Sequence, residues 1–374
     1  MAEWREKALG DITGYISKGI PPAYTDKDST TAICVLNQKC NKNFDISYED
    51  SRYHDVALRK VPSEKMLRAG DVLINSTGEG TAGRVAQIFR IPVPTTIDGH
   101  MIVMRPTDEV DSVYYGYAIK NCQKKIESIA EGSTGQTEIN RRRLQEEVLI
   151  KYPVDKDIQK AIGHFLFGID EKIRNNRKIN DNLQQQAQAI YSSMFIDNPD
   201  PAWSHGHLSD LITVKYGKDH KKLADGIYPV YGSGGIMRYV ERPLYNKESV
   251  LIPRKGTLNN VMYVNQPFWS VDTMFYTEMK LPNVAKFVYH FVKAKDLASM
   301  NAGSAVPSMT TDILNAMEVV IPSASALEEF ESLVAPMYEA MEANDVQSKA
   351  LSQMRDTLLP KLMSGEINVS AVQL

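Results

Sequence analysis

The chain has 374 residues, of which 43% are hydrophobic and 24% are charged, and its net charge is −3. This length suits two or three domains that each bury a core, and the slightly negative charge excludes a protein that coats nucleic acid over its whole surface. No apolar run approaches the roughly 20 residues that a membrane span needs, and the charged N-terminus lacks a signal peptide's apolar stretch, so we expect a cytoplasmic protein without membrane contact.

Residues 1–152 form the first predicted module, in which short strand-like runs are separated by Gly, Pro and Thr. The clearest runs cover residues 71–75, 85–90 and 101–105. The loop from Gly78 to Gly83 matches the G-x-G-x-x-G pattern of a dinucleotide site, and Asp98 follows about 20 residues later. A β-branched and aromatic segment comes next, in place of the helix whose N-terminus would hold a pyrophosphate. We therefore favour a loop between two strands, and keep as an alternative an enzyme that uses the glycine loop near Gly80.

Residues 153–197 and 323–374 each carry an apolar heptad pattern, which predicts two long helices. The seam positions alternate spacings of 4 and 3, as in a coiled coil. In the first helix they are Ile162, Leu166, Ile169, Ile173, Asn176, Asn180, Leu183, Ala187, Ile190 and Met194. Adding 168 to each number gives Phe330, Val334, Met337, Met341, Asn344, Ser348, Leu351, Arg355, Leu358 and Leu362. We expect the two helices to pack as an antiparallel coiled coil, with Asn176 and Asn344 setting its register.

The second of these helices, residues 323–374, differs from the first in its prolines and its charge. Pro336 and Pro360 weaken it locally, either as an early boundary and a late kink or as breaks in the seam. It also carries 3 basic and 8 acidic side chains. This acidic balance suits protein partners better than phosphate groups.

Residues 198–322 form the second predicted module, because motifs of the first module recur there in the same order. The turn Asn198-Pro199-Asp200-Pro201 marks its start. The recurring segments are 4–12 with 203–211, 71–74 with 249–252, 132–133 with 303–304, and 147–150 with 318–321. The chain is therefore an internal duplication of a module followed by a helix.

Three histidines of the second module, His205, His207 and His220, are close enough in sequence to be weighed as zinc ligands. No cysteine accompanies them, and the three cysteines of the chain form neither a metal pattern nor a disulfide framework. We expect no metal site. The sequence also lacks a P-loop, G-x-S-x-G and H-E-x-x-H, so we expect no catalytic residues.

Basic and hydrogen-bonding residues gather in loops at matching places in the two modules. Lys and Arg can neutralise phosphates or pair with guanine, and Asn and Gln can read adenine. Each of these residues also suits a solvated loop, but their recurrence in both modules favours DNA binding. In the first module the candidates are Lys18, Thr77, Thr81, Arg84, Thr134, Gln136 and Arg141. In the second module they are Lys215, Lys218, His220, Lys221, Ser233, Arg254, Lys255, Asn259 and Ser304.

Several of these segments resemble the specificity subunits of type I restriction-modification systems, and the likeness covers essentially the whole chain. The most specific match is the segment from Leu358 to Ile367, which is similar to the usual ending of that family. The module openings, the strand at 70–73 and the segment 231–235 are also similar. The proline-rich entries to the two helices are degenerate, and the second module is short for the family.

The resemblance implies an α+β protein in which two mixed α/β target-recognition domains, residues 1–152 and 198–322, alternate with spacer helices at 153–197 and 323–374. Each domain would read a few base pairs of a split target in double-stranded DNA, and the helices would set the gap between the two parts. The resemblance also implies two methyltransferase subunits and two restriction subunits as partners. S-adenosylmethionine, ATP and Mg would belong to those partners, with no cofactor on this chain. A two-lobed protein scaffold that does not bind DNA remains the main alternative.

Overall fold

The computed structural model describes residues 2–132, 137–300 and 308–369. The chain divides into two compact units, unit 1 with Met1–Asn175 and Val346–Leu374, and unit 2 with Asn176–Asp345. Within the described ranges, no helix combines the length and the apolar character that crossing a membrane requires.

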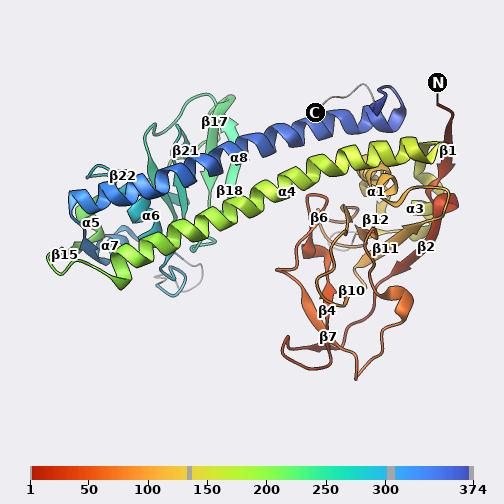
Figure 1. Ribbon diagram of the computed structural model, residues 1–374, viewed down its shortest axis with the longest axis horizontal. Helices are drawn as coiled ribbons and strands as arrows, with labels where there is room; N and C mark the ends of the chain where they lie inside the picture. Colours follow the sequence, from red (N-terminus) through yellow and green to blue (C-terminus); the bar gives the residue numbers. More distant parts are fainter. Residues whose placement is uncertain (1, 133–136, 301–307, 370–374) are drawn as a thin grey trace. The chain divides into compact units, whose positions relative to one another are not determined.

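The central sheet of unit 1, in which strands β2 and β11 are labelled in Figure 1, is antiparallel and has the strand order β2-β11-β8-β9. Its strands are β2 (Thr13–Lys18), β8 (Val72–Asn75), β9 (Val85–Gln87) and β11 (Met101–Pro106). Val72 and Ile74 belong to one hydrophobic core, whereas Leu73 belongs to another on the opposite face of the sheet. Because both faces are covered, β8 is continuously apolar instead of alternating. The strands predicted within residues 71–75, 85–90 and 101–105 are confirmed by β8, β9 and β11.

A second sheet of unit 1 has the order β10-β4-β7-β3, in which β10 and β4 are parallel. Its strands are β3 (Tyr24–Thr25), β4 (Ala32–Leu36), β7 (Arg52–Asp55) and β10 (Thr95–Ile97). Two small hairpins are formed by β5 (Asn41–Lys42) with β6 (Asp45–Ile46), and by β12 (Ala130–Glu131) with β13 (Glu138–Ile139). β1 (Trp4–Ala8) pairs with β14 (Leu149–Pro153), the strand that precedes the first long helix.

The helices of unit 1 outside the long pair are α1 (Ser112–Asn121), α2 (Gln123–Ser128) and α3 (Arg141–Glu147). α1 begins after Asp111, whose carboxylate accepts hydrogen bonds from the backbone N–H groups of Val113 and Tyr114. Its tyrosines Tyr114, Tyr115 and Tyr117 are fully buried in the core that also receives the long helices. α1 therefore joins the central sheet to the helical pair.

Unit 2 repeats this arrangement. Its sheets have the orders β16-β22-β19-β20 and β18-β17-β21, and β15 pairs with β23. The strands are β15 (Ser204–His207), β16 (Ile212–Tyr216), β17 (Asp225–Gly232), β18 (Gly235–Val240), β19 (Ser249–Pro253), β20 (Met262–Val264), β21 (Trp269–Ser270), β22 (Met274–Met279) and β23 (Glu318–Ile321). The helices are α5 (Leu208–Leu211), α6 (Ala285–Lys293) and α7 (Thr311–Asn315). The same order of paired strands in both units confirms the duplication.

Two long helices, α4 (Lys156–Ser192) and α8 (Ala324–Ser364), supply residues to both units. In unit 1 the core contains Ile162 and Leu166 together with Leu359, Leu362 and Met363. In unit 2 it contains Ala187 and Tyr191 together with Phe330 and Val334. The early part of α4 thus packs with the late part of α8, and the late part of α4 with the early part of α8. The helices are antiparallel, as the heptads predict.

Asparagines connect the two helices within unit 2. Asn344 Nδ2 donates to Asn180 Oδ1 at 2.8 Å, and Asn180 Nδ2 donates to the backbone oxygen of Met341 at 3.1 Å. Asn176 Nδ2 donates to the backbone oxygen of Asn344 at 3.3 Å. Both predicted register residues therefore join α4 to α8, and their effect on register stays a prediction.

α8 continues through both of its prolines. Val334 on one side of Pro336, and Leu359 and Leu362 around Pro360, are buried in the unit cores. Packing of these neighbours offsets the hydrogen bonds that proline removes. Of the two alternatives for these prolines, the early helix boundary at Pro336 is therefore wrong.

Candidate nucleic-acid interface

In unit 1, β2 ends at Lys18. The next residue, Gly19, lies where no side chain fits. A Cβ on Gly19 would lie 2.1 Å from the backbone oxygens of Ile97 and Asp98. This close approach brings the end of β2 against the turn that joins β10 to β11. The ammonium group of Lys18 forms an ion pair with Glu138, so Lys18 is present at the predicted place with its charge already balanced.

Thr77, which follows β8, contacts residues of three other segments of unit 1. Its Oγ1 is 2.8 Å from His100 Nδ1 and donates to Gln38 Oε1 at 3.3 Å. Thr77 also forms an isolated β-bridge with Glu138, the partner of Lys18. The structure therefore brings Lys18 and Thr77 together and adds three residues that the sequence did not single out.

The glycine loop that follows Thr77 is a tight turn between β8 and β9. Gly78, Gly80 and Gly83 have φ values of +121°, +65° and +85°, which favour glycine. The backbone N–H of Thr81 donates to Gly78 O at 3.1 Å, and Arg84 Nη2 donates to Gly80 O at 3.2 Å. Since strand β9 follows this loop directly, the helix of a dinucleotide site is missing here, as the sequence indicates. Arg84 is exposed at the end of the loop.

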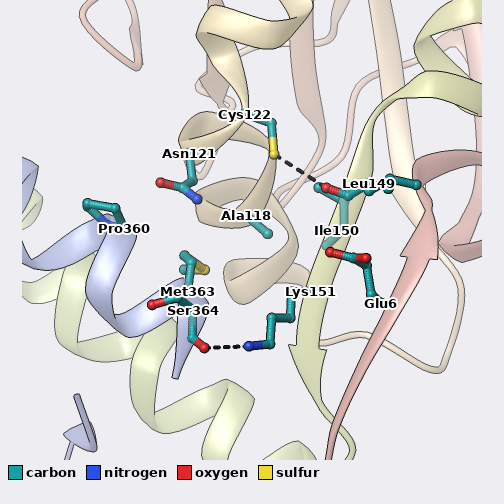
Figure 2. Close-up of a pocket in the computed structure, with 10 residues that line it drawn as sticks. All are labelled: Glu6, Ala118, Asn121, Cys122, Leu149, Ile150, Lys151, Pro360, Met363 and Ser364. Atoms are coloured by element: carbon teal, nitrogen blue, oxygen red, sulfur yellow. Dashed lines mark hydrogen bonds between the residues drawn. The ribbon is translucent and has the colours of Figure 1, made fainter. Parts of the chain in front are cut away.

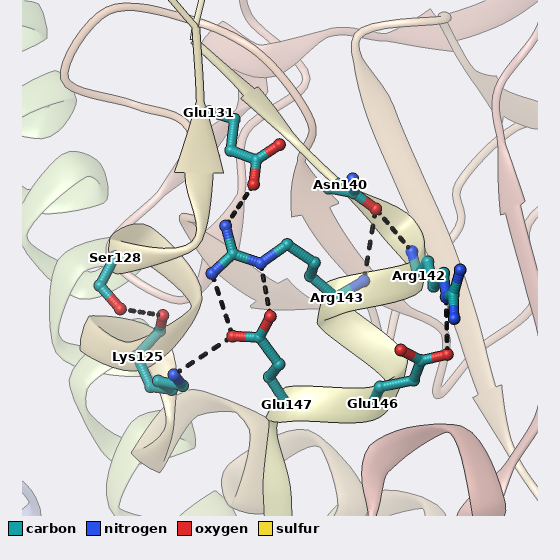
Figure 3. Close-up of polar contacts among 8 residues, drawn as sticks. All are labelled: Lys125, Ser128, Glu131, Asn140, Arg142, Arg143, Glu146 and Glu147. Carbon is teal, nitrogen blue, oxygen red and sulfur yellow. Dashed lines mark hydrogen bonds and ion pairs between the residues drawn. The ribbon is translucent and has the colours of Figure 1, made fainter.

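The three consecutive arginines at the start of α3 have different surroundings, and Figure 3 shows two of them, Arg142 and Arg143. Arg143 forms ion pairs with Glu131 and Glu147, and this contact lowers the pKa of the Glu147 carboxyl. Arg142 Nε donates to Glu146 at 2.8 Å. Arg141 is exposed and makes no ion pair with any residue that the structure describes. Among the three, Arg141 is the one whose charge is available to a phosphate.

In unit 2, strand β16 corresponds to β2 of unit 1. It ends at Tyr216, whose aromatic ring lies beneath a guanidinium group. The Arg254 guanidinium carbon lies 5.3 Å from the centre of the Tyr216 ring, and its Nη1 donates to Asp272 O at 3.2 Å. Lys215 Nζ lies 3.5 Å from a carboxylate oxygen of Glu278. Arg254 and Lys215 are thus both held by neighbours within the unit.

The segment after β16 presents two exposed lysines beside Trp269. The backbone of Lys218 is fixed on both sides, since its N–H donates to Ser270 O at 2.8 Å and its carbonyl accepts from Trp269 Nε1 at 2.8 Å. The backbone N–H of Lys221 donates to Asp219 Oδ1 at 3.0 Å, which lowers the pKa of that carboxyl. His220 is half-buried between them. Lys218 and Lys221 therefore project from an anchored backbone.

The remaining candidates of unit 2 lie in or near the loop after β19, and they differ in which neighbouring segment they contact. Lys255 is exposed, and the Asn260 side chain donates to Ser233 O at 2.8 Å, so this loop touches the turn between β17 and β18. Asn259 points elsewhere: its Nδ2 donates to Asp296 at 3.0 Å and its Oδ1 accepts from Ala298 N at 2.9 Å. Lys255 and Ser233 lie together, whereas Asn259 is used to hold a neighbouring loop. The candidates Thr134, Gln136 and Ser304 lie outside the described residues.

A pocket of unit 1 is lined by none of the candidate DNA-binding residues (Figure 2). It has a volume of about 210 Å³ and lies between α1, β14 and the end of α8, with Cys122, Lys151 and Met363 among its lining residues. Lys151 Nζ donates to the backbone oxygen of Ser364 at 2.7 Å. Burial raises the pKa of the Cys122 thiol to about 11, so it is not a thiolate near neutral pH. Within the described ranges, no group of three or more His, Cys, Asp or Glu side chains is placed to hold a metal ion.

Three residues of unit 1, Gln38, His100 and Glu138, contact the candidate residues Thr77 or Lys18 and were not predicted from the sequence. Gln38 and His100 each follow a short strand of the second sheet, in polar segments that resemble ordinary turns. The one available signal is position: both segments come directly after buried strands, where side chains of neighbouring strands meet at a sheet edge. The sequence alone does not show that β4 and β10 are neighbours.

Comparison with known proteins gives a consistent result. Residues 1–185 and 202–330 match the family model described as the type I restriction modification DNA specificity domain. The chain is 24% identical to the type I restriction enzyme MjaIX specificity subunit of Methanocaldococcus jannaschii, over 98% of this chain and 94% of that protein. It is 20% identical to the HindI specificity subunit of Haemophilus influenzae, over 98% and 100% of the two chains. The crystal structure of a type I restriction-modification S subunit from Mycoplasma genitalium has the same fold, with a TM-score of 0.60, 19% identity and 96% of each chain covered.

Proposed function

The chain belongs to the type I restriction-modification DNA specificity family, and from this membership we propose that it is the DNA-recognition subunit of a type I restriction-modification complex. In this proposal each unit reads one part of a bipartite target through the loops at the ends of its central strands. The observation that carries the proposal is the repetition: both units place basic or hydrogen-bonding side chains at or just beyond the ends of equivalent strands, Lys18 at the end of β2 and Lys218 after β16, and Thr77 after β8 and Lys255 after β19.

Phosphate contacts in this proposal come from those candidate loop cations that are exposed and that no carboxylate in the described ranges balances. These are Arg84 and Arg141 in unit 1, and Lys218, Lys221 and Lys255 in unit 2. The cations that are already paired, such as Lys18 and Lys215, contribute less, because DNA would have to displace their partners. The interface is therefore a set of local patches on a chain whose net charge is negative.

The partners follow from the same family role. We propose two methyltransferase subunits and, for restriction, two restriction subunits, which would supply S-adenosylmethionine, ATP and Mg. The chain itself would be non-catalytic. The acidic balance of residues 323–374, with 3 basic and 8 acidic side chains, supports a protein contact on α8.

The long helices act as a spacer in this proposal. α4 has 37 residues and α8 has 41, so each is roughly 55–60 Å long at about 1.5 Å per residue. Inserting one heptad into each helix should lengthen the unread gap of the target. An unchanged gap in the methylated sequence would contradict the spacer role without contradicting DNA recognition.

DNA binding by the purified chain with its methyltransferase subunits tests the function. We expect a preference for one duplex over random DNA, and an affinity that falls with salt. Replacing Arg141 or Lys255 with Ala should reduce the slope of log K against log salt by about 0.9 for each phosphate that the protein no longer neutralises. Lys178→Ala, which removes an exposed lysine from α4, is the matched control and should leave the slope unchanged. A complex that shows no sequence preference would favour the protein-scaffold alternative.

A further inference from the structure

We propose that Gln38 in unit 1 and Ser233 in unit 2 occupy equivalent positions and read base edges in the two parts of the target. This inference rests on the proposed function. Ser233 is a candidate from the sequence, whereas Gln38 emerges from its contact with Thr77 and from the repeated geometry.

The strand pairing makes the two positions equivalent. β4 lies parallel to β10 with Leu36 opposite Ile97, and β17 lies parallel to β21 with Tyr231 opposite Ser270. Gln38 is two residues beyond Leu36, and Ser233 is two residues beyond Tyr231.

Gly19 and Gly217 make matching close contacts with β10 and β21, the partners of the two strands. A Cβ on Gly19 would lie 2.1 Å from the backbone oxygen of Ile97, and one on Gly217 would lie 2.6 Å from that of Ser270. The backbone N–H of Gly19 donates to Met101 O at 3.1 Å, and that of Gly217 donates to Met274 O at 3.0 Å. The frame around the two positions is therefore the same in both units.

A second glycine in each unit lies against the side chain in question. Gly78 and Gly256 have φ values of +121° and +85°, a region that L residues rarely adopt. A Cβ on Gly78 would be 3.1 Å from Gln38 Oε1, and one on Gly256 would be 2.8 Å from Ser233 Oγ. Both side chains thus occupy space that a larger residue in the neighbouring loop would restrict.

An asparagine amide holds the backbone in both units. Asn75 Nδ2 donates to the carbonyl oxygen of Gln38 at 3.1 Å, and Asn260 Nδ2 donates to that of Ser233 at 2.8 Å. Asn75 is the last residue of β8, whereas Asn260 lies in the loop between β19 and β20, yet the two asparagines bind equivalent carbonyl groups. The hydrogen bond to the backbone carbonyl is thus present in both units, whereas the side chain at that position differs. Two domains that recognise different base sequences require this combination.

The hydrogen bonds around Gln38 leave its amide nitrogen available. The Thr77 hydroxyl donates to Gln38 Oε1 at 3.3 Å. In this orientation of the amide, Gln38 Nε2 has no partner among the described residues and is free to donate. Gln38 therefore suits a base acceptor such as N7 of a purine, O6 of guanine or O4 of thymine.

Ser233 offers a shorter side chain with a different capacity. Its Oγ makes no hydrogen bond within the described ranges, and a hydroxyl can both donate and accept. The residue that corresponds to Thr77 in this unit is Lys255, since Thr77 bridges Glu138 and Lys255 bridges Ser308. Unit 2 thus combines a short neutral reader with a cation, whereas unit 1 combines a longer reader with a histidine and a threonine.

Selection from a randomised duplex library tests the proposal, with the full chain in complex with its methyltransferase subunits. Gln38→Glu keeps the shape and replaces the Nε2 donor with an acceptor. We expect the preferred base at one or two positions of one target part to weaken roughly tenfold, and a base that presents a donor there, such as cytosine or adenine, to gain. Ser233→Ala should relax positions in the other part only.

The unaffected part of the target is the internal control in each variant. Gln38→Ala, with thermal unfolding measured in parallel, separates loss of reading from loss of folding. Unchanged preferences in both parts, or an equal weakening of both parts, would overturn the proposal while the proposed function stands. If the wild-type complex selects no sequence at all, the proposed function itself fails.

Discussion

Where α1 of unit 1 meets the long helices the contact includes a buried charge, whereas at the corresponding place of unit 2, where α6 meets them, the contact is made by a neutral imidazole. Elsewhere in unit 2 an ion pair also joins α6 to α8, with Lys286 Nζ 2.6 Å from Glu331 Oε1. In unit 1, Asp170 of α4 accepts from Tyr117 Oη of α1 at 2.6 Å and from Arg355 Nη1 of α8 at 2.5 Å. In unit 2, His290 of α6 contacts Gln188 Oε1 of α4 at 2.8 Å and Tyr338 Oη of α8 at 3.0 Å.

These contacts occupy corresponding places, because Tyr338 is 168 residues beyond Asp170, the offset between the heptads. The duplication has therefore kept a polar contact between module and helices and changed its chemistry. Burial raises the pKa of Tyr117, and Asp170 beside it acts in the same direction. Burial lowers the pKa of His290 to about 4, with a further contribution from Lys293. The two units should consequently respond differently to substitution and to pH.

Removing the cation of unit 1 should have the largest effect. The side chain of Asp170 is 7% exposed, so Arg355→Met leaves a buried carboxylate without its counter-ion. We expect the free energy of unfolding to fall by about 3–5 kcal/mol, measured by urea denaturation. The double variant Asp170→Asn with Arg355→Met should recover most of this loss. A single variant as stable as wild type would show that the ion pair is not needed.

Acid should destabilise unit 2 through His290. The pKa of His290 is about 4 in the folded protein against an ordinary value of 6.5, so the unfolded chain binds this proton more readily. The stabilisation is complete above pH 6.5 and is lost as pH falls towards 4, by about 3 kcal/mol at most. Urea denaturation across this range should show the loss in wild type and a smaller one in His290→Gln. Equal pH dependence in both proteins would contradict the assignment.

A smaller difference should separate the two tyrosines. Tyr338→Phe removes a hydroxyl from a neutral imidazole and should cost about 1–2 kcal/mol, whereas Tyr117→Phe removes one from a carboxylate and should cost more. Thermal unfolding of the two variants gives the comparison. The reverse order would mean that Arg355 alone satisfies Asp170.

The smallest effect should come from an exposed ion pair. Arg142 and Glu146 are one turn apart on α3, with 83% and 59% of their side chains exposed. Arg142→Ala should leave the melting temperature unchanged, because water and salt screen such pairs. A clear loss of stability would indicate that α3 depends on its surface charges.

The sequence predicts the helical pair well because heptad spacing is a local property that survives in the folded state. Adding 168 to the seam of α4 gives a seam on α8, and burial of Leu166 and Val334 agrees with it. Arg355 also falls on that seam, where the pattern expects an apolar residue. Its reason is Asp170, which is distant in sequence and becomes a neighbour only in the antiparallel arrangement.

The candidate site is less predictable, because the partners of its side chains are distant in sequence and become neighbours only in the folded chain. Chemistry identifies which loop residues can bind DNA, but not which of them the fold has already paired. Lys18 and Asn259 are satisfied by Glu138 and Asp296, whereas Arg141 is exposed without an ion pair in the described ranges. The duplication supplies information that single residues lack, since equivalence between units identifies Gln38.

Unit 1 is discontinuous in sequence, and this has a consequence for synthesis on the ribosome. Its core includes Leu362 and Met363, and a Cβ on Gly365 would lie 2.7 Å from the ring of Trp4. These residues are translated only after all of Asn176–Asp345, the continuous segment that forms unit 2. Unit 2 can therefore complete its core while unit 1, although begun first, still exposes apolar surface. During that interval unit 1 is the part of the nascent chain that chaperones would bind.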